Sequence, residues 1–391
     1  RLTDPDHAGS ALVKEVQALL ASNWTQRPSE TLVGDLGHRD RRVRFEAQWE
    51  LARRGEGELL IAAATSDQAD SIARLHAIWG MDQIARTDPN ADPHLLQAIG
   101  TLLDCSDSTL RAAAAKVVGE RQESTAASKL RSMLRDDQPR VRYFATLSLA
   151  QLKDASALDS VVALLAENDN SDPALRHAGI VFLANVDDQK KVAALKSHAN
   201  VSVRRAAVVA LRRRSSNAIR EFLSDSDPLV VLEAARAIHD VPIPVAIGEL
   251  ANMIEGEPED PELTRRVLNS NYRLGTPEAA NKLAAFCARF SASPEMRIEA
   301  LDMLANWANP DPRDRVLGAY RPLKERSAKV ASDALSAHID ALMTAEDVVR
   351  EKAIETAAGL GLTKIVPRLL ERVKNVDQRP SLRANALRAL A

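Results

Sequence analysis

The sequence predicts an all-α fold, an α–α superhelix or solenoid of about ten stacked helix pairs. Three observations support this prediction. A short motif centred on an arginine returns every 28 to 37 residues, and apolar residues recur with helical rather than strand spacing. The third is composition, because the chain is rich in alanine but has only 6 Phe, 4 Trp and 3 Tyr. Thin helical layers need small residues at their contacts and have room for few aromatic side chains.

The repeated motif consists of an acidic or small polar turn residue, then an aliphatic residue followed by arginine, then a run of alanine and aliphatic residues. Its first arginines are Arg44, Arg74, Arg111, Arg142, Arg176 and Arg204, which are separated by 30, 37, 31, 34 and 28 residues. This spacing is typical of a helix–turn–helix unit. An apolar segment with helical period precedes the motif, as in residues 157–165, and supplies the first helix of the pair.

The turn before the second helix carries signals for helix initiation. Asp172, Asp227 and Asp260 are each followed directly by proline. Such an aspartate can accept hydrogen bonds from the free amides of the first turn, and proline is tolerated there because its missing N–H has no intrahelical partner. We therefore expect second helices to start at these positions.

Departures from the motif divide the chain into regions. The step from Arg297 to Arg350 is 53 residues, which predicts a repeat with an inserted surface loop. The last repeat ends inside a helix, so we expect it to belong to a longer chain. The predicted regions are an N-terminal capping helix region (1–29), a repeat array (30–308), the inserted loop (309–324) and C-terminal repeats (325–391).

The motifs, including Asp40-Arg-Arg-Val-Arg44 and Asp137-Gln-Pro-Arg-Val-Arg142, resemble the HEAT-repeat family and its short phycobilisome-lyase-type variety. The resemblance covers residue 30 to the C-terminus. It implies antiparallel helix pairs stacked into a curved superhelix, with a ladder of aspartates and arginines between neighbouring repeats. The ladder residues that it implies are Asp40, Arg44, Arg111, Asp137, Arg142, Asp172 and Arg176.

The sequence contains no complete catalytic or cofactor motif. No two of the eight histidines have the i, i+4 spacing of zinc hydrolases, and the two cysteines, Cys105 and Cys287, are far apart. Cys-x-x-Cys-His, a glycine-rich phosphate loop and a nucleophile elbow are also missing. We therefore expect no enzymatic activity, no cofactor and no metal in this region. The formal net charge of −2 argues against general affinity for nucleic acid or anionic membranes, and no segment is apolar enough to insert into a bilayer.

Two features are candidates for contact with a partner. Six arginines lie between positions 204 and 220, and large aromatic residues flank the predicted insertion. Arginine clusters bind phosphates or acidic surfaces, and exposed aromatic side chains anchor protein partners. The candidate residues are Arg204, Arg205, Arg212, Arg213, Arg214, Trp307 and Tyr320. The arginine cluster leaves an alternative open, a HEAT-like nucleic-acid-binding protein or alkyl-purine DNA glycosylase.

Four stretches carry a closer resemblance, residues 37–55, 73–80, 235–240 and 313–318. They are similar to the helical middle region of large exported bacterial proteins, which join a quinoprotein dehydrogenase-like β-propeller to a HEAT array and a C-terminal cytochrome c domain. This resemblance implies a non-enzymatic scaffold in an extracytoplasmic, periplasmic compartment, docking either flanking domains of its own chain or a separate protein. It implies no catalytic residue, because neither the propeller nor the haem-attachment motif lies in this sequence.

Overall fold

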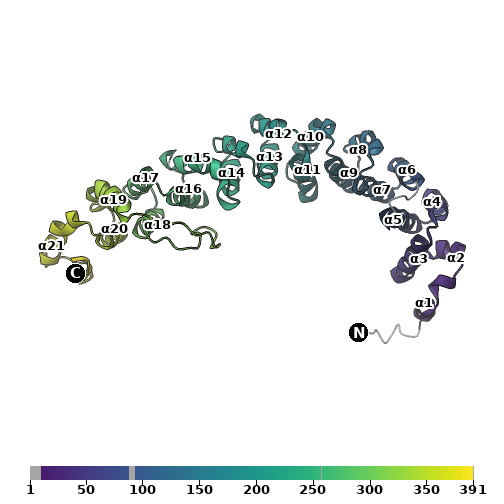
Figure 1. Ribbon diagram of the computed structural model, residues 1–391, viewed down its shortest axis with the longest axis horizontal. Coiled ribbons are helices and arrows are strands. Elements are labelled where there is room, and N and C mark those ends of the chain that lie inside the picture. Colours follow the sequence, from purple (N-terminus) through teal and green to yellow (C-terminus); the bar gives the residue numbers. More distant parts are fainter. Residues whose placement is uncertain (1–9, 88–92, 257, 391) are drawn as a thin grey trace. The chain divides into compact units, whose positions relative to one another are not determined.

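The computed structural model describes residues 10–87, 93–256 and 258–390. The chain consists of two compact units, Arg1–Val192 and Ala193–Ala391. Within each unit the helices form pairs that follow one another in two rows (Figure 1). In the described part of the chain the only β-structure is one isolated bridge. The predicted all-α fold of stacked helix pairs is confirmed.

Unit 1 begins with α1 (Ala11–Ala21), which is capped by the hydroxyl of Ser10 and contacts the second helix of the first pair. Residues 1–9 of the predicted capping region lie outside the described residues. The pairs are α2 (Ser29–Asp35) and α3 (Arg41–Arg54), α4 (Gly57–Thr65) and α5 (Ser71–Thr87), α6 (Pro93–Thr101) and α7 (Ser108–Glu120), α8 (Ala127–Met133) and α9 (Pro139–Gln151), α10 (Leu158–Asn168) and α11 (Pro173–Asn185). The next helix, α12 (Gln189–Ala194), contains the boundary between the units.

Unit 2 continues with α13 (Val201–Arg213) and has the same organisation. Its pairs are η6 (Asn217–Phe222) and α14 (Pro228–Asp240), α15 (Ile247–Asn252) and α16 (Pro261–Leu274), α17 (Pro277–Cys287) and α18 (Pro294–Ala305), α19 (Ala328–Leu342) and α20 (Asp347–Gly359), α21 (Val366–Lys374) and α22 (Pro380–Leu390). In both units, each second helix contacts its own first helix and the neighbouring second helices. None of the described helices combines the length and apolar character that crossing a bilayer requires.

Second helices start at the positions that the sequence predicts. The side chains of Asp172, Asp227 and Asp260 are N-caps that accept hydrogen bonds from first-turn amides of α11, α14 and α16, and proline follows each of them. Because these caps fix where each helix begins, they also fix which side chains face the core.

The core lies where each second helix packs against its own first helix and against the neighbouring second helices. On α9, Val141, Ala145 and Leu149 recur every four residues and are fully buried. Small residues allow close helix contact: a Cβ added at Gly119 of α7 would lie 2.6 Å from the Cα of Ser148 on α9. Glycine is therefore required at this crossing, where the Ser148 hydroxyl also donates to the Ala115 carbonyl at 2.7 Å.

Residues 306–327, between α18 and α19, contain no helix. This inserted loop includes the predicted insertion 309–324. It runs back along unit 2, past α16 towards α14 (Figure 1). Arg313 and Tyr320 form an antiparallel bridge near its tip. The loop therefore lies against second helices of unit 2.

Candidate binding groove

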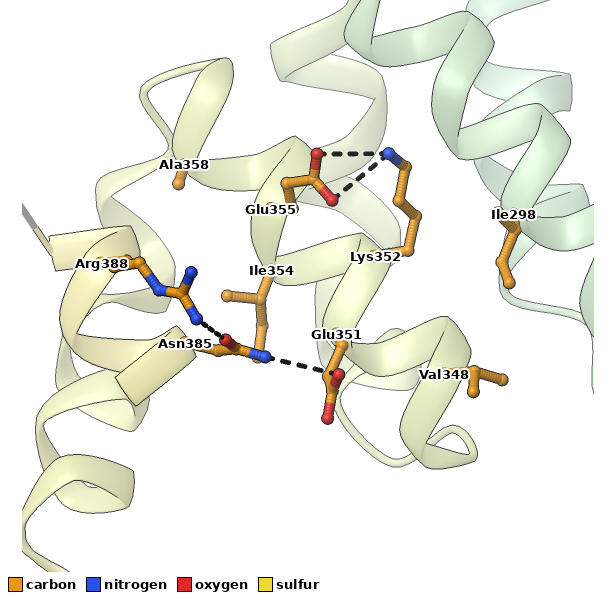
Figure 2. A pocket seen from close by; sticks show the side chains of 9 residues that line it. All are labelled: Ile298, Val348, Glu351, Lys352, Ile354, Glu355, Ala358, Asn385 and Arg388. Carbon is orange, nitrogen blue, oxygen red and sulfur yellow. Dashed lines mark hydrogen bonds and ion pairs between the residues drawn. The ribbon is translucent and has the colours of Figure 1, made fainter. Parts of the chain in front are cut away.

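An open cavity of about 530 Å³ lies between α18, α20 and α22 of unit 2 (Figure 2). We call this cavity the α20 groove, because α20 supplies most of its lining. The lining residues are Ile298 from α18, Val348, Glu351, Lys352, Ile354, Glu355 and Ala358 from α20, and Asn385 and Arg388 from α22. The groove thus combines aliphatic surface with carboxylate, ammonium and guanidinium groups from three consecutive second helices.

The helical period of α20 separates its core side from its groove side. Val349 and Ala353 are fully buried, whereas Val348 and Lys352, one residue before each, reach the groove. Val348 is 57% exposed. Such an exposed aliphatic side chain beside apolar neighbours favours contact with a partner, although single exposed residues of this kind are common on protein surfaces.

Ion pairs hold the charged groups of the groove in place. The Lys352 ammonium lies 2.7 Å from Asp302 on α18 and 3.3 Å from Glu355, one turn further along α20. Burial lowers the pKa of Lys352, but hydrogen bonds to these carboxylates outweigh burial and raise it above its ordinary value. On the other side of the groove, the Asn385 amide donates to Glu351 (Figure 2). Lys352 is therefore a fixed positive charge at neutral pH.

The inserted loop is anchored to α16 by a buried carboxylate. The Asp314 side chain is fully buried and lies 3.1 Å from the Arg273 guanidinium and 3.4 Å from that of Arg321. It also accepts hydrogen bonds from the amides of Val316 and Leu317, both at 3.0 Å, which closes a tight turn within the loop. One carboxylate thus shapes the loop and attaches it to α16.

A polar network continues from Asp314 into α14 and α16. The Asn269 amide group lies 3.1 Å from Asp314 and 2.9 Å from Nε2 of His239, so its two N–H groups can serve both acceptors. Nδ1 of His239 lies 2.8 Å from Asp240. These partners assign the proton to Nδ1 and leave Nε2 as an acceptor. Arg266 also pairs with Asp240, at 3.0 Å. The network is satisfied without an external ligand.

We expect Asp240→Asn to reduce the acid sensitivity of the protein. Burial raises the pKa of Asp240, but hydrogen bonds from His239 and Arg266 outweigh burial and lower it to about 2. A depressed carboxyl pKa adds stability above the unfolded-state value, near 4, and this stability is lost as pH falls towards 2. Urea unfolding measures the free energy of unfolding between pH 5 and 2.5. Over this range it should fall by up to about 2 kcal/mol less in the variant than in the wild type. In the exposed control Asp333→Asn, the free energy of unfolding should depend on pH as it does in the wild type. If it depends on pH equally in both variants, Asp240 is not the source of the acid sensitivity.

One side chain of α18 lies close both to the inserted loop and to a residue that lines the α20 groove. Asp302 of α18 lies 2.7 Å from Lys352 in the groove and 3.9 Å from Arg315 in the loop. Asp302 therefore connects Arg315 of the loop with Lys352 of the groove. The loop itself exposes aromatic and aliphatic surface, because Tyr320 is 73% and Leu317 40% exposed.

A ladder between repeats exists, but its aspartate differs from the one that the resemblance implies. Arg111 of α7 donates through Nη1 to the carbonyls of Cys105 and Ser106 in its own turn, both at 2.8 Å. Its other nitrogens bind Asp136 in the next turn, at 2.9 and 3.0 Å. Among the described residues the neighbouring Asp137 is exposed and forms no ion pair, so its assignment to the ladder was wrong.

Arg204 of α13 repeats this geometry in unit 2. It donates to the carbonyls of His198 and Ala199 at 3.0 and 3.1 Å and binds Asp225 at 2.7 and 2.9 Å. Arg204 is only 7% exposed. Arg204 therefore belongs to the ladder. The prediction that its side chain is free to contact a partner was wrong.

The other predicted ladder residues have mixed roles. Asp40 and Asp172 cap their own helices, and Arg44 binds the carbonyl of His38 at 2.6 Å and His76 of the next pair at 3.0 Å. Arg142 lies 3.6 Å from Glu167. Arg176 is exposed and has no ion pair within the described residues, which removes it from the ladder.

The remaining arginine candidates are spread along α13. Arg205 lies in the first turns of α13, whereas Arg212, Arg213 and Arg214 lie at its C-terminal end, about 12 Å further along the helix axis. There they are placed to interact favourably with the helix dipole. Trp307 is fully buried, with the Arg326 guanidinium 4.1 Å from its ring centroid. Trp307 is therefore a packing residue, which corrects its prediction as a partner contact.

Sequence reasoning did not identify the groove residues, Asp314, or the ladder aspartates Asp136 and Asp225. For Asp314 a local sequence signal exists, because aspartate and glycine are typical turn residues and Gly318 follows four positions later. In the structure Gly318 has a φ of +65°, as a tight turn requires. For Val348 and Lys352 no motif stands out. Within the described ranges, no three His, Cys, Asp or Glu side chains are grouped so that they could hold a metal ion.

Comparisons with known proteins address the fold. A family model of HEAT repeats matches residues 93–172, which include α6 to α10. No curated protein matches the chain. A structure of importin beta is 11% identical over 97% of this chain and 59% of its own, with a TM-score of 0.48. Kap121p bound to Nup53p is 12% identical over 98% of this chain and 51% of its own, with a TM-score of 0.45. The complex of CpcE and CpcF of phycocyanin lyase from Nostoc is 18% identical over 81% of this chain and 97% of that chain, with a TM-score of 0.25.

Proposed function

We propose that this chain is a non-enzymatic scaffold that binds protein segments on its second helices, and that the α20 groove is a docking site. The observation that carries the proposal is the groove itself, in which exposed Val348 and half-buried Ile298 provide aliphatic surface beside fixed charges. Stacked helices offer an extended contact surface without needing a single enclosed pocket.

The docking site can be tested with a random dodecapeptide library displayed on phage. Peptides selected on the wild-type chain should bind Val348→Asp at least about tenfold more weakly, because a carboxylate replaces the apolar contact. The matched control is Val376→Asp, at a 74% exposed position outside the groove lining, and it should bind as the wild type does. Selected peptides that bind both variants equally would show that the groove is not the docking site.

The alternative function, binding or repair of nucleic acid, makes a separate prediction. Arg204 is engaged by Asp225 and Arg220 lies 3.2 Å from Glu249, which leaves fewer free cations than the sequence suggests. Under our proposal the chain does not retard duplex DNA at about 0.15 M salt, where exposed charges are screened beyond about 8 Å. Retardation, together with excision of an alkylated base, would replace the scaffold proposal with the glycosylase alternative.

We further propose that the scaffold is the helical middle region of an exported redox protein. This step is supported only by the sequence resemblance of residues 37–55, 73–80, 235–240 and 313–318. The complete reading frame tests it, because it should encode a β-propeller before this region and Cys-x-x-Cys-His after it, with an export signal. A frame that lacks all three would refute the redox context and leave the docking site to its own test.

A further inference from the structure

A second surface of different chemistry lies on α3 in unit 1. Arg42, Phe45, Trp49 and Arg53 are spaced three or four residues apart, so they form one stripe along the helix. Trp49 is 49% exposed, and the side chains of Arg42 and Arg53 are 62% and 61% exposed. We call this stripe the α3 platform. It has two aromatic rings at its centre and a guanidinium at each end.

The aromatic centre is held rigidly. Phe45 and Trp49 stack with ring centroids 5.6 Å apart and planes at 17°. The buried ring of His76 contacts Phe45 edge-on at 5.3 Å and Trp79 at 4.9 Å. His76 is itself fixed by Gln48, at 2.8 Å. The exposed indole of Trp49 is therefore presented on a packed base.

The positive charges of the platform lie at its two ends, whereas the histidine behind its aromatic centre is neutral. Burial, and then the charge of Arg44, lowers the pKa of His76 to about 4, so the ring is neutral at pH 7. The Arg42 and Arg53 guanidiniums at the two ends each pair with a carboxylate that is less exposed than the arginine. Asp40 is 21% exposed beneath Arg42, and Glu50 is 7% exposed beneath Arg53. The outer edges of both guanidiniums remain available to acceptors, since each carries more N–H groups than its partner uses.

The spacing of these groups specifies a ligand length. Arg42 and Arg53 are 11 residues apart, about 16 Å along the helix, and Trp49 lies about 10 Å from Arg42. An extended or polyproline II segment advances about 3.1–3.3 Å per residue, so about five residues span the two arginines. The residue opposite Trp49 is then about three positions after the first carboxylate.

We propose that the α3 platform binds an extended acidic protein segment in which two carboxylates, five residues apart, flank a proline that packs on Trp49. The carboxylates complement Arg42 and Arg53 as charge-assisted hydrogen-bond acceptors. Proline suits the aromatic centre because polyproline II segments are already extended and dock on aromatic surfaces at low entropic cost. This surface is separate from the α20 groove and does not depend on it.

A protein segment fits the platform better than a nucleic-acid strand does. A strand of B-DNA carries a phosphate about every 3.4 Å along its axis, so it would place several negative charges between the two arginines. Glu46 lies on that part of α3, next to Phe45. A segment with only two spaced carboxylates avoids this repulsion.

The test uses the full chain and a fluorescein-labelled peptide, Gly-Ser-Glu-Gly-Ser-Pro-Gly-Glu-Ser-Gly, in fluorescence anisotropy titrations. We expect saturable binding that weakens as salt rises. Trp49→Ala should weaken it at least about tenfold, and Arg53→Ala up to about fivefold. Arg53 is a suitable site because Glu50 keeps its second partner, Arg54, at 2.7 Å. Phe290→Ala removes a 64% exposed aromatic residue of unit 2 and should leave binding unchanged.

Two further probes decide the specificity. A peptide of the same composition with its glutamates adjacent should bind at least about fivefold more weakly. Single-stranded oligothymidine should bind no more tightly than that scrambled peptide. The proposal is overturned by equal affinity for the two peptides, by wild-type affinity in Trp49→Ala, or by tight binding of the oligonucleotide alone. Thermal melting of each variant ensures that lost binding is not lost folding.

Discussion

Replacing Val141 with aspartate is expected to destabilise unit 1 by about 4 kcal/mol. Val141 is fully buried on α9, which contacts α7, α8 and α11. A carboxylate there would have no partner and would lose its hydration on folding. Because each helix pair is stable only against its neighbours, the damage should extend to the adjoining pairs.

Denaturant unfolding followed by circular dichroism measures this effect. The control is Arg213→Ala, which removes an exposed side chain at the end of α13 and should change stability by less than about 0.5 kcal/mol. Comparable unfolding curves for the two variants would contradict the placement of Val141 in the core.

Asp314→Ala should release the inserted loop and cost about 3 kcal/mol. The substitution removes the acceptor for two turn amides and leaves Arg273 and Arg321 half-buried without their carboxylate. Burial, and then the neighbouring charge of Arg321, already lowers the pKa of Arg273, which indicates how poorly this guanidinium is solvated. Losing the compensating charge should therefore be costly.

Limited trypsin digestion detects the released loop directly. In the wild type, cleavage after Arg313 and Arg315 should be slow, whereas Asp314→Ala should be cut there early. Asp311→Ala serves as the control because Asp311 lies in the same loop and is exposed, where it accepts a hydrogen bond from the nearby Arg313 amide. If both variants resist trypsin equally, Asp314 does not anchor the loop.

The fold could be predicted from the sequence because its determinants are local and repeated. Asp172 and Asp227 mark helix starts by the same capping interaction wherever they occur, and the spacing of the arginines gives the repeat length. The ladder was harder to assign. Asp136 and Asp137 are adjacent, and only the conformation of the turn decides which carboxylate faces Arg111.

The sites depend on residues from several helices, and no local pattern reveals them. The α20 groove joins Ile298 to Arg388, so it requires the relative placement of three second helices. Trp307 looked like an exposed anchor because it precedes the insertion, but Arg326 from the other end of the loop stacks over its ring. In both cases tertiary packing decides exposure.

The anchoring of the inserted loop has a consequence for the order of folding. Ladder contacts such as Arg111 to Asp136 join residues 25 positions apart, whereas the guanidinium of Arg321 reaches the carbonyl of His239 across 82 positions. Closing the longer segment costs more chain entropy, and its binding surface exists only after α14 and α16 have assembled. The loop is therefore expected to attach only after α14 and α16 have assembled, later than the ladder contacts form.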